Sequence, residues 1–93
     1  MKLGKVLKNL RVDAGLSQRE VSVKMGYTTP QLISNNERDI SLPPMSSLKK
    51  LASIYNVETS VLYSAVKTKY MDKISQKLDK KFYGRKAKTN TKV

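Results

Sequence analysis

The chain has 93 residues and a net charge of +12, with 19 Lys and Arg residues against 7 Asp and Glu residues. It contains neither Cys nor His, which removes disulfides, thiolate metal sites and the commonest general base, so we expect no enzyme, no metal site and no cofactor. A folded chain this basic usually has a polyanionic partner, with nucleic acid the first candidate and an anionic membrane surface the second. The N-terminal residues do not form a signal peptide and no apolar run is long enough to span a bilayer, so we expect a cytoplasmic protein without a membrane partner.

The first two predicted helices are separated by a glycine. Apolar residues recur at helical spacing over residues 3–10, and Gly15 supplies a stop for this first helix. Ser17 and Glu20 then have the spacing of a capping box, in which each side chain bonds to the backbone amide of the other residue. This motif predicts a second helix over residues 18–25.

A tight turn is expected between the second helix and the third. Gly26 permits the turn because glycine adopts positive φ without strain. Thr29 is the predicted N-cap of the third helix, with Pro30 at its first position, and the helix is expected to continue to about Glu37. The inside of this corner is expected to be packed by Val21, Met25 and Ile33.

The remaining pattern is also helical. A loop is predicted over residues 38–44, and the fourth helix follows it with one apolar face formed by Leu48, Leu51, Ala52 and Tyr55. A fifth helix begins at about Glu58 and carries Val61 and Leu62. No segment alternates with a period of two, so the fold class is predicted to be all-α.

The second and third predicted helices, joined by a glycine turn, outline a helix-turn-helix. In this motif the second of the two helices, here the third of the chain, places its outer face in the major groove of DNA. Short amide side chains on that face suit base edges, adenine above all. A plain solvated helix face is the alternative for the polar positions. An outward Leu could either meet a thymine methyl group or turn partly into the core. The predicted outer face consists of Gln31, Leu32, Ser34 and Asn35.

The sequence resembles the lambda-repressor-like, Cro/C1-type (XRE) helix-turn-helix family over roughly residues 3–65. The resemblance is carried by Gly15-Leu16-Ser17-Gln18-Arg19-Glu20-Val21, by the segment from Met25 to Asn35, and by Glu37-Arg38. It implies a five-helix domain that binds double-stranded DNA without a cofactor, usually as a dimer on an inverted repeat.

The resemblance also implies roles for single residues. Gln18 is expected to hold a phosphate, and Gln31 and Asn35 are expected to read bases with Ser34 close by. Leu32 is a base-reading candidate from its place on the same helix face, apart from the resemblance. Arg11 and Glu37 match the internal ion pair of the family. Further phosphate contacts are expected from Arg19, Thr29 and Arg38.

Two positions depart from the family pattern. Asn36 occupies a place where the family commonly has Trp or an aliphatic residue, so a looser core corner is expected there. Asp39 replaces the usual Gly after the recognition helix, and the loop is expected to persist because Asp tolerates left-handed geometry better than most residues.

The segment over residues 66–83 is predicted to be an appended amphipathic helix. Apolar residues recur every four positions, while most lysines lie away from them. Such a helix needs a cover: its own domain, a second copy or a membrane surface. Self-pairing is favoured, because two-fold DNA sites require a symmetric dimer. The expected dimerisation residues are Tyr70, Ile74 and Leu78.

The predicted organisation is therefore a DNA-binding domain over residues 1–65, a C-terminal helix over 66–83 and a disordered basic tail over 84–93. The leading function is a sequence-specific transcription regulator, a repressor that binds an inverted-repeat operator as a homodimer. The alternative is an antitoxin-type protein whose basic C-terminal segment binds a toxin while the domain represses the operon.

Overall fold

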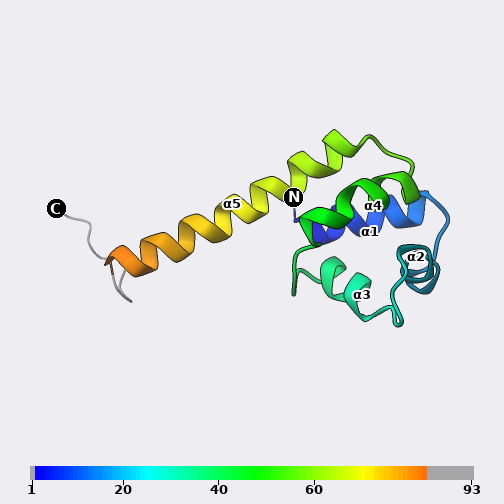
Figure 1. The fold of residues 1–93 in the computed structure, drawn as a ribbon, viewed down its shortest axis with the longest axis horizontal. Coiled ribbons are helices and arrows are strands. Elements are labelled where there is room, and N and C mark those ends of the chain that lie inside the picture. The colour runs from blue at the N-terminus through cyan, green and yellow to red at the C-terminus, as the bar shows by residue number, and fades with distance from the viewer. Residues whose placement is uncertain (1, 84–93) are drawn as a thin grey trace.

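The computed structural model describes residues 2–83 of the chain, and over this range it is entirely helical (Figure 1). The predicted all-α fold with five α-helices is confirmed, with a short 3₁₀ helix in addition. The basic tail expected over residues 84–93 lies outside the described residues. The elements in chain order are α1 (Leu3–Asp13), α2 (Gln18–Met25), α3 (Gln31–Glu37), η1 (Met45–Ser47), α4 (Leu48–Ile54) and α5 (Thr59–Tyr83).

The ends of α2 follow the local chemistry of the sequence. Ser17 Oγ accepts from the Glu20 amide at 3.0 Å, and the Glu20 carboxylate accepts from the Ser17 amide at 2.8 Å, so the capping box is present. Gly26 ends the helix with a φ of 85°. α3 begins at Gln31, one residue later than expected, although Thr29 Oγ1 still accepts from the Gln31 amide at 3.3 Å.

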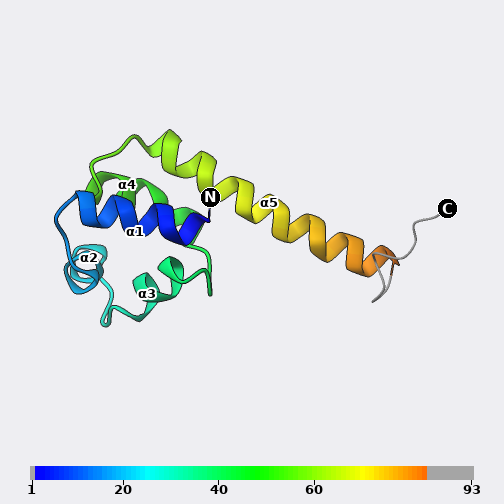
Figure 2. The ribbon, with the colours of Figure 1, turned by 180° about the vertical axis from the view of Figure 1, so that it is seen from behind.

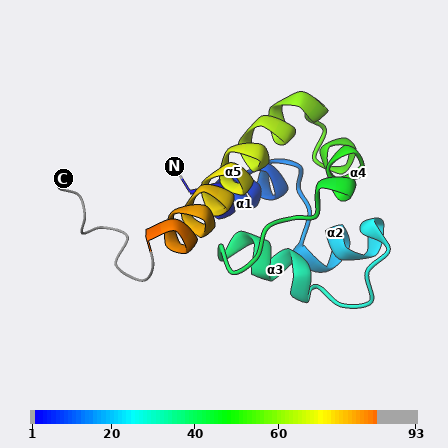
Figure 3. The same ribbon diagram turned by 60° about the vertical axis from the view of Figure 1, so that its left-hand side comes forward.

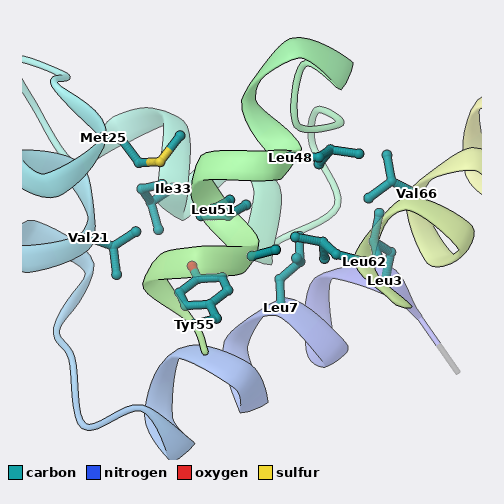
Figure 4. Packing of buried hydrophobic residues seen from close by; sticks show 11 residues of the cluster. Leu3, Leu7, Val21, Met25, Ile33, Leu48, Leu51, Tyr55, Leu62 and Val66 are labelled. Carbon is teal, nitrogen blue, oxygen red and sulfur yellow. The ribbon is translucent and has the colours of Figure 1, made fainter. Parts of the chain in front are cut away.

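The core is built from all five α-helices (Figure 4). Every residue assigned to the corner between the second and third helices is buried, and so is the whole predicted face of α4. In α5 only Leu62 of the expected pair is buried, while Val61 is exposed. Each fully buried aliphatic side chain contributes about 1.5–3 kcal/mol. This shared core holds α2 and α3 against α1 and α4.

The N-terminus of α1 packs tightly against the end of α3. A Cβ atom on Gly4 would overlap the carbonyl oxygen of Glu37, so only glycine fits at this crossing. Asp39 has a φ of 59°, as its tolerance of left-handed geometry predicts. Its Oδ1 accepts from the Gly4 amide at 2.9 Å, which supplies the first turn of α1 with a capping carboxylate from another part of the chain.

α5 is one continuous helix that leaves the rest of the molecule halfway along its length (Figures 1 and 2). Its first turns pack against α4 and α1, and Val66 is fully buried there. The expected division at residue 65 falls inside this helix, and the proposed split into separate domains stays a prediction.

The apolar stripe of α5 changes its surroundings along the helix. Tyr70 was expected at a dimer interface, but it packs against the core of its own chain, and its hydroxyl donates to the Pro43 carbonyl at 2.9 Å. Beyond this point Ile74 is 50% exposed and Leu78 is 60% exposed. Part of the stripe therefore folds back on the chain, and the rest is uncovered in the monomer.

Candidate nucleic-acid interface

α2 and α3 lie together on one side of the molecule, with the outer side of α3 turned away from α1 and α4 (Figure 3). The turn between them is fixed by α2. The Tyr27 amide donates to the Ser22 carbonyl at 2.9 Å, and the buried Ser22 hydroxyl donates to the carbonyl of Thr29. This second bond holds the chain two residues before the start of α3 and thereby sets the direction in which α3 begins.

The carboxyl end of α3 is fixed by the expected ion pair. Arg11 Nε donates to Glu37 Oε2 at 2.6 Å, and a second guanidinium nitrogen donates to Oε1 at 3.1 Å. The two side chains are only 12% and 4% exposed, respectively. The hydrogen bond to Glu37 raises the pKa of Arg11 against the opposing effect of burial. Arg11 also donates to the Leu16 carbonyl at 2.9 Å, so one side chain joins α1, the segment before α2, and α3.

Gln18 takes part in the same cluster. Its side-chain amide donates to Glu37 Oε1 at 3.0 Å, so it bonds to protein in the free chain, and its expected contact with a phosphate stays a prediction. The three donors around Glu37 satisfy a carboxylate that would otherwise be costly to bury.

Asn36 takes a different role from the expected one. It is 6% exposed, and its Nδ2 donates to the carbonyl and the hydroxyl of Ser41 at 3.0 and 3.1 Å. A buried amide thus replaces an apolar side chain and ties the following loop to α3. The expected looseness of this corner is not seen, because the hydrogen bonds of Asn36 fix the loop against α3 in place of apolar packing.

The outer face of α3 presents amides that are linked to one another. Gln31 is exposed, and its Nε2 donates to Asn35 Oδ1 at 2.9 Å. Arg38 donates to the same oxygen at 3.0 Å. Asn35 and Ser34 are half-buried. The amide groups expected to read bases therefore occupy defined positions in the free protein.

Leu32 lies at the edge of this face. It is half-buried and lines a shallow open concavity with the turn residues 26–29, beside Gln31 and Asn35. Part of the side chain is covered and part is exposed, and its contact with a thymine methyl group stays a prediction.

The residues expected to bind phosphate surround α3 without forming one cluster. Arg19 is exposed on α2, and Thr29 is exposed before the first turn of α3. Arg38 is exposed but bonded to Asn35. Their contacts with phosphate stay predictions. Within residues 2–83 no group of acidic side chains could hold a metal ion, and no helix is long and apolar enough to cross a bilayer.

Among the contacts that were not foreseen from the sequence are those of Ser22 with Thr29, Asn36 with Ser41, and Arg38 with Asn35. The third could have been found, because residues three apart on a helix are neighbours and an arginine following an outward asparagine can reach it. The other two depend on the path of a loop, for which the residue pattern gives no signal.

A short helix capped by a serine, a left-handed glycine and a second short helix with an outward amide face together define a helix-turn-helix DNA-binding fold. Comparison with known families agrees, since the helix-turn-helix family matches residues 7–62. The chain therefore belongs to the helix-turn-helix family of Cro/C1 (XRE) type, a family of DNA-binding transcription regulators.

A curated relative is similar to most of the chain. The HTH-type transcriptional regulator ImmR of Bacillus subtilis (strain 168) is 44% identical over 62 residues. The match covers 67% of this chain and 48% of the relative, so the chain spans about half the length of that protein.

Proposed function

We propose that this protein binds an inverted-repeat operator as a dimer, reads its bases through α3, and represses transcription by occupying the site. The linked amides on the outer face of α3 carry this proposal. Gln31 and Asn35 are spaced one helical turn apart, and each retains hydrogen-bonding groups that are not used within the pair. Such amides suit base edges in the major groove.

The test of base reading begins with selection of bound sequences from a random DNA library. On the selected site, Asn35→Ala should weaken binding by about 1–3 kcal/mol while leaving the affinity for random DNA nearly unchanged. Asn9→Ala makes the same chemical change at an exposed position of α1 and should leave both affinities unchanged. Equal losses on selected and random DNA in the Asn35 variant would remove the proposed role.

The dimer is supported by the uncovered part of α5. The side chains on one side of the projecting half are at least half exposed: Met71, Ile74, Leu78 and Phe82 at 56%, 50%, 60% and 80%. A second copy of the helix could cover this face with the same residues, which is what a two-fold symmetric site requires. Tyr70 is not part of the proposed interface, because it packs on its own chain.

Sedimentation of the full chain tests the dimer. Leu78→Asp places a charge in the proposed interface and should convert the dimer to a monomer. Gln76→Asp introduces the same charged side chain away from the apolar side chains and should leave the dimer intact. A wild-type chain that is monomeric at concentrations well above its Kd for the selected site would exclude the dimer, whatever the variants show.

Repression is tested by transcription in vitro. A promoter carrying the selected site should lose transcript as the protein is added, and a promoter with a scrambled site should not. Increased transcript from the promoter with the intact site would identify an activator instead.

A further inference from the structure

The side-chain oxygen of Asn35, Oδ1, accepts two hydrogen bonds from residues on either side of it along α3. Gln31 Nε2 donates at 2.9 Å from the first residue of the helix, and the guanidinium of Arg38 donates at 3.0 Å from the residue after its end. All three side chains lie on the outer face, where the proposed function places DNA. The question is which edge each amide presents to a base.

Arg38 determines the orientation of the Asn35 side-chain amide, because a guanidinium group carries only hydrogen-bond donors. It can bond to the oxygen of Asn35 but not to its amide nitrogen, so the orientation of the Asn35 amide is fixed. That oxygen then requires a donor from its second partner, and Gln31 must turn its Nε2 inward. The groups left for DNA are the acceptor Oε1 of Gln31 and the donor Nδ2 of Asn35.

This order of acceptor and donor selects between the purines. In the major groove adenine presents the N6 amino donor beside the N7 acceptor, whereas guanine presents two acceptors, O6 and N7. An acceptor on Gln31 with a donor on Asn35 matches adenine and would place two oxygens face to face on guanine. The repulsion is as important to specificity as the attraction.

We infer that Arg38 is a positioning residue: it sets the polarity of the Gln31–Asn35 pair so that the pair reads one adenine and rejects guanine. The inference rests on the proposed function, since it requires α3 to lie in the major groove. It differs from the phosphate contact expected for Arg38 from the sequence, because a phosphate contact strengthens binding to every sequence alike.

The experiment uses the full chain and one position of the selected site. This is the base pair at which the Asn35→Ala variant no longer prefers one base over another. Two duplexes are compared that differ only at this position, one with adenine and one with guanine. Wild-type protein should prefer adenine by about 10- to 100-fold, the range expected for a two-bond base contact. In Arg38→Ala the Asn35 amide is free to rotate, and the preference should fall below about threefold.

Arg38→Lys provides the matched control, because an ammonium group is also a donor without acceptors. It should retain a preference of at least about tenfold. In a second measurement that does not depend on any Arg38 variant, 7-deazaadenine removes the N7 acceptor from the DNA. Wild-type protein should bind this duplex about tenfold more weakly than the adenine duplex, and Asn35→Ala should bind both equally.

Several results would overturn the inference while leaving DNA binding in place. One is an Arg38→Ala variant that weakens both duplexes equally and keeps the preference for adenine, as a phosphate contact would. Others are a preference for guanine in the wild type, equal losses in the Ala and Lys variants, or indifference of the wild type to 7-deazaadenine. Failure of the proposed function gives a different result, since the library would then yield no enriched sequence.

Discussion

Replacement of Arg11 by Met tests the cluster that fixes the end of α3. Met keeps much of the aliphatic length of the side chain but removes the guanidinium group. Glu37 then loses two of its three donors and keeps only the amide of Gln18 at 3.0 Å. The Leu16 carbonyl loses its bond from the same side chain.

The size of the effect follows from burial. The Glu37 side chain is 4% exposed, so its carboxylate cannot recover the lost bonds from water without local rearrangement. Removing one partner of a buried pair costs about 3–5 kcal/mol, and the remaining amide places the expected loss near the lower limit, about 3 kcal/mol. A small domain is stable by only about 5–15 kcal/mol, so this loss is a large part of the total.

Urea unfolding followed by circular dichroism measures the change. With a slope of about 1–1.5 kcal/mol per molar urea, the midpoint should fall by about 2–3 M at unchanged slope. Arg19→Met makes the same substitution at an exposed residue and should change stability by less than about 0.5 kcal/mol. Equal midpoints in the two variants would refute the reasoning. If it holds, the double variant Arg11→Met with Glu37→Met should recover part of the loss, because no buried charge remains.

Three further predictions concern pH, base recognition and salt. Burial raises the pKa of Tyr55 to about 12 from an ordinary value of 10.0. The buried neutral phenol therefore stabilises the folded state fully below pH 10, and this stabilisation is lost as the pH rises to about 12. Over that interval wild-type protein should lose about 2–3 kcal/mol more unfolding free energy than Tyr55→Phe; equal losses contradict the assignment. Replacing single thymines of the selected site by uracil should weaken wild-type binding at one position, and Leu32→Ala should abolish that sensitivity; an unchanged sensitivity places the side chain away from the methyl group. Operator affinity should fall steeply between about 50 and 200 mM salt, because a chain of net charge +12 displaces counterions from phosphates; a flat response argues against phosphate contacts.

Much of the fold could be predicted because its signals are local or periodic. The capping box depends on two residues three apart, and the left-handed turn depends on Gly26 alone. The core faces of α2, α3 and α4 follow from helical spacing. The ion pair of Arg11 with Glu37 is different, since its partners are 26 positions apart and only the family resemblance brought them together.

The remaining features depend on where distant elements meet. The apolar repeat of α5 indicates one helix face, but it does not show how far along that face the rest of the chain extends. The structure places this limit near Tyr70, which is covered, while Ile74 one turn later is half exposed. The contacts of Gln18 with Glu37 and of Asn36 with Ser41 could not be predicted for a similar reason, because the partner of a polar side chain is decided by a neighbouring helix or loop.

The contacts around α3 explain how so short a helix can keep the defined geometry that the proposed reading of DNA requires. A helix of seven residues is not stable by itself, so its geometry must come from tertiary contacts. Its start is held by Ser22 through the carbonyl of Thr29, and its end is held by Arg11 through Glu37. Because these bonds already exist in the free chain, little further ordering of the backbone is required on binding, and more of the contact energy remains for discrimination between bases. We therefore expect losses at either end of α3 to reduce specificity before they unfold the protein, which makes Arg11 a test of recognition as well as of stability.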